Sequence, residues 1–101
     1  MKGRPKKRRI LQKEPAITQF SPRGRAGRPG EIQIKYEEYE AIRLNDQVEV
    51  SQKDAAAFMG ISQQTFSRIL KTGRKKLAEA LVKGKIIKVA GGSYRIEKSL
   101  K

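Results

Sequence analysis

The stretch Gln52–Lys71, QKDAAAFMGISQQTFSRILK, decides the fold because it carries two helix starts around one glycine. Ser51 just before it and Ser62 within it can each accept a hydrogen bond from the first turn of a following helix. Gly60 lies between these caps, at a sharp turn where glycine adopts a left-handed backbone at least cost. The pattern predicts two helices joined by a short turn.

Small and apolar residues stand where two crossing helices touch. Ala56 is the fifth residue of this stretch, Phe66 the fifteenth and Ile69 the eighteenth. A small residue lets the second helix cross closely, and the apolar residues fill the wedge between the two helices. The spacing predicts a helix-turn-helix. Capped amphipathic helix pairs also occur in proteins that never touch DNA, so this pattern alone does not decide whether the chain binds DNA.

The composition favours a polyanionic partner. The chain has 101 residues, enough for one small domain, with 24 Lys and Arg against 10 Asp and Glu, a formal charge of +14. Nucleic acid, and double-stranded DNA in particular, is the expected partner. With no cysteine and no histidine, zinc fingers, disulfide frameworks, thiol catalysis and histidine acid-base chemistry are excluded. We expect no enzyme, no metal site and no cofactor.

The charge is unevenly distributed along the chain. Residues 1–30 carry a net +9, residues 31–50 a net −4 and residues 51–101 a net +9. The acidic stretch is expected to be a solvated helix face or a surface turned away from DNA, with a docking site for a basic protein as the alternative. No apolar run approaches the roughly 18 residues of a membrane span and no signal-peptide core is present, so we expect no membrane association and a cytoplasmic, nucleoid-associated protein.

Residues 1–30 are expected to form a basic, partly flexible N-terminal arm. They contain all four prolines and few apolar residues, and Ile17–Phe20 is a candidate for a short strand. Two Gly-Arg-Pro cores resemble the minor-groove-binding AT-hook and make Arg4 and Arg28 candidates for a minor-groove arm. The alternative is a basic tail that attracts phosphates without regard to sequence.

Residues 31–84 are expected to form the helix-turn-helix domain. A bracing helix is predicted from about Tyr36 to Asp46, as the third member of a trihelical core. The second helix of the pair is predicted to continue to about Val82, with Gly84 as its C-terminal cap. Gly73 interrupts this run, and it predicts either a break or a close helix crossing.

Residues 85–101 are expected to form a small C-terminal β-hairpin packed on the same domain. Two β-rich runs, 85–90 and 93–97, flank Gly91 and Gly92, which permit the positive φ angles of a tight turn. Since an isolated hairpin is marginal in water, it should pack on the helices, pair with the N-terminal strand or pair with a second copy. A wing that touches DNA through Lys88 or Arg95 is the alternative.

Four segments together resemble a known family: YEEYEAIRLND, VSQKDAAAFMGISQQTFSRIL, KKLAEALVKGK and GGSY. The chain resembles the domain-of-unknown-function 134 family, small bacterial and archaeal proteins described as predicted DNA-binding, from Arg4 to Tyr94. Its helical part is similar to region 4 of bacterial sigma factors. The resemblance implies a mainly α fold, a trihelical sigma region 4-like core, and a cytoplasmic role like that of a transcription regulator. Some relatives carry cysteines near the basic N-terminal segment, where this chain has Arg8 and Arg9, so no metal role is implied here.

Helix-turn-helix geometry predicts the DNA contacts. The outward side chains early in the second helix reach base edges in the major groove, because the inner face holds the first helix. The expected base readers are Gln63, Gln64, Ser67 and Arg68. The expected phosphate contacts are Lys53, Ser62, Thr65, Lys71, Arg74 and Lys75.

Three functions follow from these features. The first is sequence-specific binding of double-stranded DNA by a transcription regulator. The second is RNA binding or non-specific coating of the nucleoid, and the third is a sigma-like adaptor that binds RNA polymerase through the acidic stretch. The sequence does not fix the operator, the regulated genes, the sign of regulation, an effector or the oligomeric state, and a homodimer stays open.

Overall fold

The computed structural model describes residues 8–24 and 27–97 and consists of a helical core beside small strands. The helical elements are α1 (Tyr36–Ile42), its π-helical continuation η1 (Arg43–Gln47), α2 (Gln52–Phe58) and α3 (Gln63–Lys83). The strands are β1 (Arg9–Leu11), β2 (Gln19–Phe20), β3 (Glu31–Ile34), β4 (Ile86–Val89) and β5 (Tyr94–Ile96). The described chain is therefore mainly helical, as expected.

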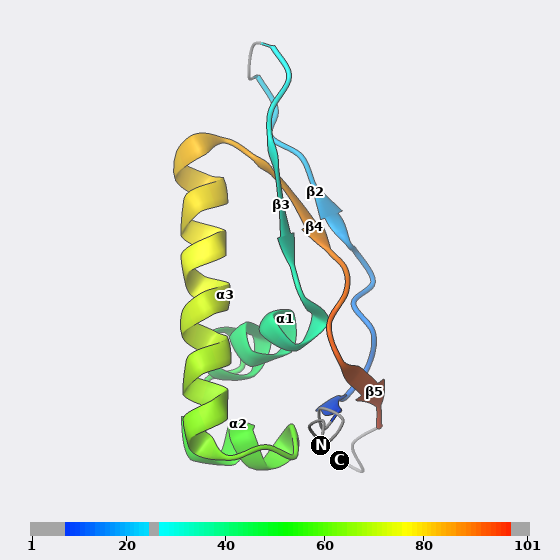
Figure 1. The fold of residues 1–101 in the computed structure, drawn as a ribbon, viewed down its shortest axis with the longest axis vertical. Coiled ribbons are helices and arrows are strands. Elements are labelled where there is room, and N and C mark those ends of the chain that lie inside the picture. The colour runs from blue at the N-terminus through cyan, green and yellow to red at the C-terminus, as the bar shows by residue number, and fades with distance from the viewer. Residues whose placement is uncertain (1–7, 25–26, 98–101) are drawn as a thin grey trace, which may run out of the picture.

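α3 and the three-stranded sheet run along the long axis of the molecule, and α1 lies across it between them (Figure 1). Figure 1 shows α3 upright along one side and the strands β2, β3 and β4 along the other, with α1 crossing between them and α2 beneath the start of α3. The molecule measures 44 × 39 × 22 Å. Every helix of the described residues is too short or too polar to cross a bilayer.

The hydrophobic core lies where the helices meet. Its buried members come from α1, η1, α2 with the residue that follows it, and α3: Ala41, Leu44, Ala55, Ala56, Met59, Phe66 and Leu70. Ala56 is 2% exposed and Phe66 is fully buried, as the crossing of two helices requires of a small and a large residue. The apolar spacing of the sequence thus identified Ala56 and Phe66 correctly, whereas Ile69 packs against this core only partly buried.

Local capping signals define the ends of α2 and α3. The Ser51 hydroxyl accepts a hydrogen bond from the Asp54 amide at 3.0 Å, and the Ser62 hydroxyl accepts one from the Thr65 amide at 3.1 Å. Gly60, with φ of 68°, makes the turn between the helices, and Gly84, with φ of 64°, ends α3 in the left-handed conformation. These four positions match the prediction.

Gly73 marks a close helix crossing, and α3 continues through it without a break. A Cβ added at Gly73 would lie 3.0 Å from the Cβ of Glu38 and 3.2 Å from Cδ1 of Ile42. Glycine therefore allows the close approach where α1 passes over the middle of α3. Of the two expectations for this residue, the close crossing is confirmed.

The predicted C-terminal β-hairpin is wrong, because β4 and β5 do not pair with each other. β4 lies between β2, which is antiparallel to it, and β3, which is parallel, while β5 pairs in parallel with β1. Both edges of β4 are thus occupied and leave no edge for β5. The strand expected at 17–20 is present as β2, and together with β1 it means that segment 1–30 contributes one strand to each of the two sheets.

The two glycines between β4 and β5 allow a close approach to α1 and do not make a hairpin turn. The Gly91 carbonyl accepts a hydrogen bond from the Tyr36 amide at 3.1 Å, and a Cβ at Gly92 would collide with the Glu37 carboxylate. Both glycines have positive φ. The same backbone freedom that suggested a hairpin is used here to pass over the N-terminus of a helix.

The three acids of α1 in the acidic stretch do not form a solvated helix face, whereas Glu31, Asp46 and Glu49 are exposed. Glu37 and Glu38 are 4% exposed, and Glu40 is fully buried. Their carboxylates accept hydrogen bonds from residues far along the chain: Ser93 for Glu37, Lys76 for Glu38 and Gln12 for Glu40. The prediction was wrong for these acids because the donors that offset the cost of burying a carboxylate come from the segment after β1, from α3 and from the segment before β5.

Candidate nucleic-acid interface

The outward face of α3 carries an exposed polar and basic stripe. Gln64, Arg68, Lys71 and Lys75 recur at intervals of three and four residues, so they share one face of the helix, opposite to Phe66 and Leu70. All four are exposed. Arg68, Lys71 and Lys75 make no hydrogen bond or ion pair with other residues in the described part of the chain. These side chains are available to an external partner.

Gln63 and Ser67 border this stripe on the side of α2. Both are exposed, and the Ser67 hydroxyl donates a hydrogen bond to Oε1 of Gln52 at 2.7 Å. This contact joins the start of α2 to the second turn of α3 and leaves the amide nitrogen of Gln52 as a donor. Sequence reasoning missed Gln52, since only the packing of the two helices brings it beside Ser67.

Ser62 and Thr65 both use their hydroxyls in the start of α3. The Ser62 hydroxyl caps the helix and donates to the Thr65 hydroxyl at 3.0 Å. The free amides of the first turn lie at the same place and give this end of α3 a partial positive charge. Phosphate contact here would come from backbone amides at least as much as from the two hydroxyls.

Arg74 is engaged within the protein. Its guanidinium donates to both carboxylate oxygens of Asp46, at 2.6 and 3.1 Å, and to Oδ1 of Asn45 at 3.0 Å. The hydrogen bonds from Arg74 hold the pKa of the Asp46 carboxyl below its usual value. Arg74 thus links α3 to η1, and it would have to leave Asp46 to bind a phosphate.

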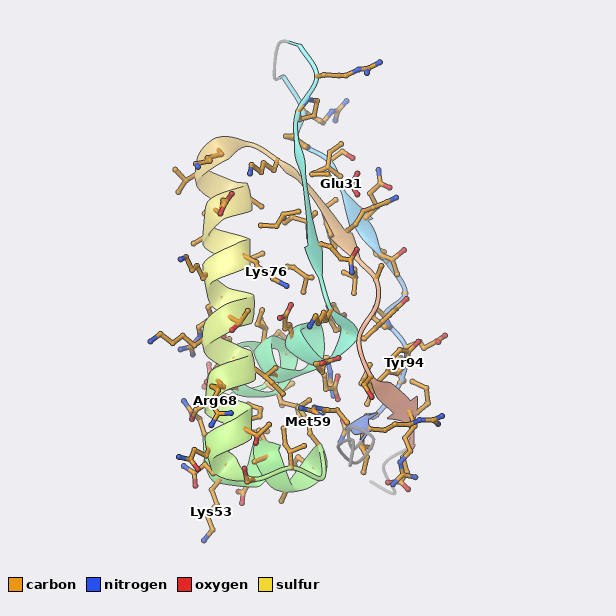
Figure 2. All side chains as sticks on the ribbon, in the orientation of Figure 1. Glu31, Lys53, Met59, Arg68, Lys76 and Tyr94 are labelled. Carbon is orange, nitrogen blue, oxygen red and sulfur yellow. The ribbon has the colours of Figure 1, made fainter. Side chains whose placement is uncertain are left out.

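The remaining predicted contacts lie in different places. Lys53, on the first turn of α2, is exposed and lies at the same end of the molecule as Arg68 (Figure 2). Arg28 is exposed and belongs to the segment that joins β2 to β3. Figure 1 shows that this segment reaches the opposite end of the long axis from α2. The structure therefore does not bring Arg28 together with the residues of α3. Arg4 lies outside the described residues.

Arg9 is a basic residue near the interface that sequence reasoning did not select. It is 9% exposed and lines a hollow of about 610 Å³ together with Gly60, Ser62 and Thr65. β1 brings it there, because the Ile10 amide bonds to the Met59 carbonyl at 3.1 Å. No local pattern could reveal this position, since it depends on a strand docking against the turn between α2 and α3.

Clusters of acidic side chains would be the candidate metal sites of this chain, which has no cysteine and no histidine. Within residues 8–24 and 27–97, no group of three or more acidic side chains is arranged to hold a metal ion. The chemistry that the interface offers is hydrogen bonding by amides and hydroxyls together with positive charge. Such chemistry binds and discriminates polyanions.

Comparison with known proteins places the chain in a family. The family model described as "Protein of unknown function DUF134" matches residues 1–97. The chain belongs to the DUF134 family. A UPF0251 protein of Methanococcus maripaludis strain C7 is 44% identical over 96 residues, which cover 94% of this chain and 74% of the relative. The UPF0251 protein of Thermoanaerobacter pseudethanolicus is 44% identical over 94 residues, or 92% and 80% of the two chains. No solved structure matches the chain.

The DUF134 match covers both the helical pair and the strands. It extends from the N-terminal segment through β5, so the two sheets and the outward face of α3 lie within the region shared with relatives in archaea and bacteria. The resemblance found from the sequence is thereby confirmed as a family relationship. The names of these relatives state no activity.

Proposed function

We propose that this chain is a sequence-specific double-stranded DNA-binding protein, a transcription regulator that reads the major groove with α3. The observation that carries the proposal is the exposed stripe of Gln64, Arg68, Lys71 and Lys75 on a helix whose opposite face is buried against α2. In a helix-turn-helix of the sigma region 4 type, this is the helix that enters the groove. α1 would then be the bracing helix.

The first two turns of α3 offer the chemistry of base recognition. Glutamine can pair bidentately with adenine and arginine with guanine, and each such pair contributes about 1 to 3 kcal/mol of discrimination. Gln63, Gln64 and Arg68 are exposed at the start of α3. Ser67 can contribute through its hydroxyl or through the Gln52 amide that it orients.

Phosphate contacts would flank these base contacts. Lys71 and Lys75 continue the stripe along α3. Lys53 projects from α2 at the same end of the molecule as Arg68 (Figure 2). Phosphate contacts fix the register of a protein on the duplex without carrying sequence information. Arg74 is a weaker candidate because Asp46 already binds it.

The burial of the three acids of α1 weakens the polymerase-adaptor alternative. Glu37, Glu38 and Glu40 face partners inside the protein, so they offer no acidic helix surface to a basic partner. RNA binding and non-specific coating of DNA are distinguished from the proposed function by experiment, since both rely on charge without sequence.

The test is selection of bound duplexes from a randomised DNA pool. We expect the native chain to enrich a defined sequence. Arg68→Ala should relax the preference at one base position, while Lys75→Ala should weaken binding to all sequences alike and lower the salt slope by about 1. Unchanged sequence preference in Arg68→Ala would overturn the assignment of that residue.

Lys88→Ala is the matched control. It removes the same charge as Lys75→Ala, from an exposed residue on β4 and not on α3. It should therefore lower affinity less than Lys75→Ala. Enrichment of no sequence at all, with equal binding of structured RNA at rising salt, would contradict the proposal and favour charge-driven binding.

A further inference from the structure

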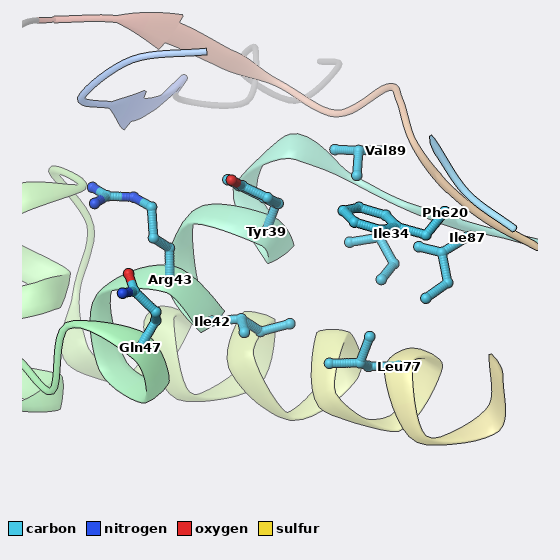
Figure 3. Close-up of a pocket in the computed structure, with 9 residues that line it drawn as sticks. All are labelled: Phe20, Ile34, Tyr39, Ile42, Arg43, Gln47, Leu77, Ile87 and Val89. Carbon is cyan, nitrogen blue, oxygen red and sulfur yellow. The ribbon is translucent and has the colours of Figure 1, made fainter. Parts of the chain in front are cut away.

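An apolar groove lies between the three-stranded sheet and the helices. It has a volume of about 470 Å³ (Figure 3). Phe20, Ile34, Ile87 and Val89 form its sheet wall, and Ile42 and Leu77 face them from α1 and α3. The sheet therefore presents an apolar face that the helices cover only in part.

Large apolar side chains remain exposed around this groove. Phe20 is 48% exposed and Leu77 38%. Leu81, one turn after Leu77 on the same face of α3, is 81% exposed. The Cα radius of gyration is 14.6 Å, above the roughly 13 Å of a compact domain of about 100 residues. The molecule is extended and leaves this apolar side open.

The groove side is nearly neutral, unlike the chain as a whole. Arg43 is the one charged residue among those that line the groove, and its guanidinium pairs with Glu40 at 2.9 Å. Arg74, on the neighbouring face of α3, pairs with Asp46 at 2.6 Å. Since each chain carries a formal charge of +14, a second copy meets least repulsion where the cations are already paired.

The same side carries both a protrusion and a hollow. Leu81 projects beside the groove that Leu77 lines, and a two-fold interface requires a surface that is complementary to itself. The outward stripe of Gln64, Arg68, Lys71 and Lys75 lies on a different face of α3 and would stay accessible.

We infer that the occupant of this groove is a second copy of the chain, with Leu81 of each protomer inserted into the groove of the other. Burial of a leucine that is largely exposed in the single chain supplies a favourable apolar contribution at both ends of the two-fold interface.

Sedimentation of the full chain without DNA tests the inference. At a salt concentration that screens the net charge, the native protein should be a dimer over a wide range of protein concentration. Leu81→Asp should raise the dimer dissociation constant at least tenfold, because it places a carboxylate in an apolar groove. Phe20→Ser, on the opposite wall, should also weaken the dimer.

Val82→Asp is the matched control for Leu81→Asp. Val82 is equally exposed, at 81%, but it points to the outward face of α3, away from Leu77. This variant should remain dimeric and melt like the native chain. Leu81→Asp should keep the native far-UV circular dichroism spectrum, because Leu81 is exposed in the single chain, but it should melt lower than the native dimer once association is lost. A monomeric native protein, or equal sedimentation of Leu81→Asp and the native dimer, would overturn the inference.

A third outcome would identify a different occupant. A native monomer that takes up an apolar dye, with Phe20→Ser abolishing the uptake, would overturn the inference in favour of a small-molecule site. Neither result would decide the proposed function, because a monomer can bind an asymmetric DNA site and a protein can form a dimer without binding DNA. The two failures are therefore distinguishable.

Discussion

Glu40 is a fully buried carboxylate that accepts hydrogen bonds on both of its oxygens. Oε1 accepts a hydrogen bond from Nε of Arg43 at 2.9 Å. Oε2 accepts one from Nη2 of Arg43 at 2.9 Å and one from the backbone amide of Gln12 at 3.2 Å. It thus joins α1 to the segment that follows β1. The hydrogen bond and charge of Glu40 also raise the pKa of the Arg43 guanidinium, which stays protonated.

Glu40→Gln should destabilise the protein strongly although it preserves the shape of the side chain. Whichever way the amide is turned, its NH₂ group faces a donor from Arg43, which is left without its counter-charge. Breaking a buried pair in this way costs about 3 kcal/mol, or a fall in melting temperature on the order of 15 °C. Thermal unfolding followed by circular dichroism measures it.

Glu97→Gln is the control for this change. Glu97 forms an exposed ion pair with Arg95 at 3.4 Å, so the same chemical substitution there should leave the melting temperature nearly unchanged. Equal melting of the two variants would contradict the assigned role of Glu40.

Asp46 makes stability depend on pH in acid. Its pKa is lowered in the folded state by hydrogen bonding to Arg74, so its contribution is fully present above the unfolded pKa near 4 and is lost as pH falls through the lower folded value. Because the pair is exposed, the contribution is at most about 1 kcal/mol after solvent screening. Asp46→Asn should therefore be less stable than the native chain at pH 6, and equally stable once Asp46 is protonated.

Urea denaturation at several pH values measures this difference. Added salt should reduce it at pH 6, because an exposed pair is screened. A gap between the two proteins that persists at the lowest pH would show that the effect of the substitution does not come from the charge of Asp46.

At the scale of elements, the crossing of α1 over α3 depends on Gly73. Alanine in a helix interior is favoured over glycine by about 1 kcal/mol, but overpacking costs about 1 to 3 kcal/mol. The added Cβ would lie 3.0 Å from the Glu38 Cβ, which cannot move away without its backbone. We expect Gly73→Ala to lower the urea midpoint.

The substitution Thr72→Ala, at the neighbouring position, is expected to raise the urea midpoint. Thr72 is exposed in the same helix, so alanine there should raise stability by a few tenths of a kcal/mol through helix propensity alone. A stabilised Gly73→Ala variant would show that the crossing has room for a methyl group.

The helices could be predicted from the sequence and the strand pairing could not. Ser51, Gly60, Ser62 and Gly84 act within one or two turns of their own position, so a local pattern was enough to identify them. The partners of β4 come from residues 19–20 and 31–34, far along the chain, and a turn signal such as Gly91 with Gly92 says nothing about them.

Some features of the candidate interface could likewise be predicted from local sequence, and others could not. The exposed stripe on α3 followed from helical periodicity, because the buried face fixes the outward one. The pairing of Arg74 with Asp46 and the position of Arg9 beside Ser62 depend on long-range packing. Charge alone suggested an exposed acidic face, whereas the burial of Glu37, Glu38 and Glu40 required donors that no local pattern reveals.

At the scale of the whole molecule, the proposed DNA contact and the inferred dimer together limit the spacing of the DNA site. Arg68 lies 13 residues before Leu81 on α3, or about 20 Å along the helix axis. With a two-fold axis near Leu81, the two Arg68 residues can be separated along the helices by no more than about 40 Å. One turn of B-DNA, about 34 to 36 Å, lies within this reach, and two turns do not.

We therefore expect the strongest binding to an inverted repeat whose half-sites are one helical turn apart. Binding should be measured on duplexes that carry the selected half-site twice, with the spacer lengthened one base pair at a time. Affinity should peak at a centre-to-centre distance of about 10 base pairs and fall on either side, because each added base pair also rotates one half-site away from the common face. Leu81→Asp should remove the peak while binding to a single half-site persists. A maximum at two turns, or equal affinity for a direct repeat, would contradict a two-fold dimer formed through the groove.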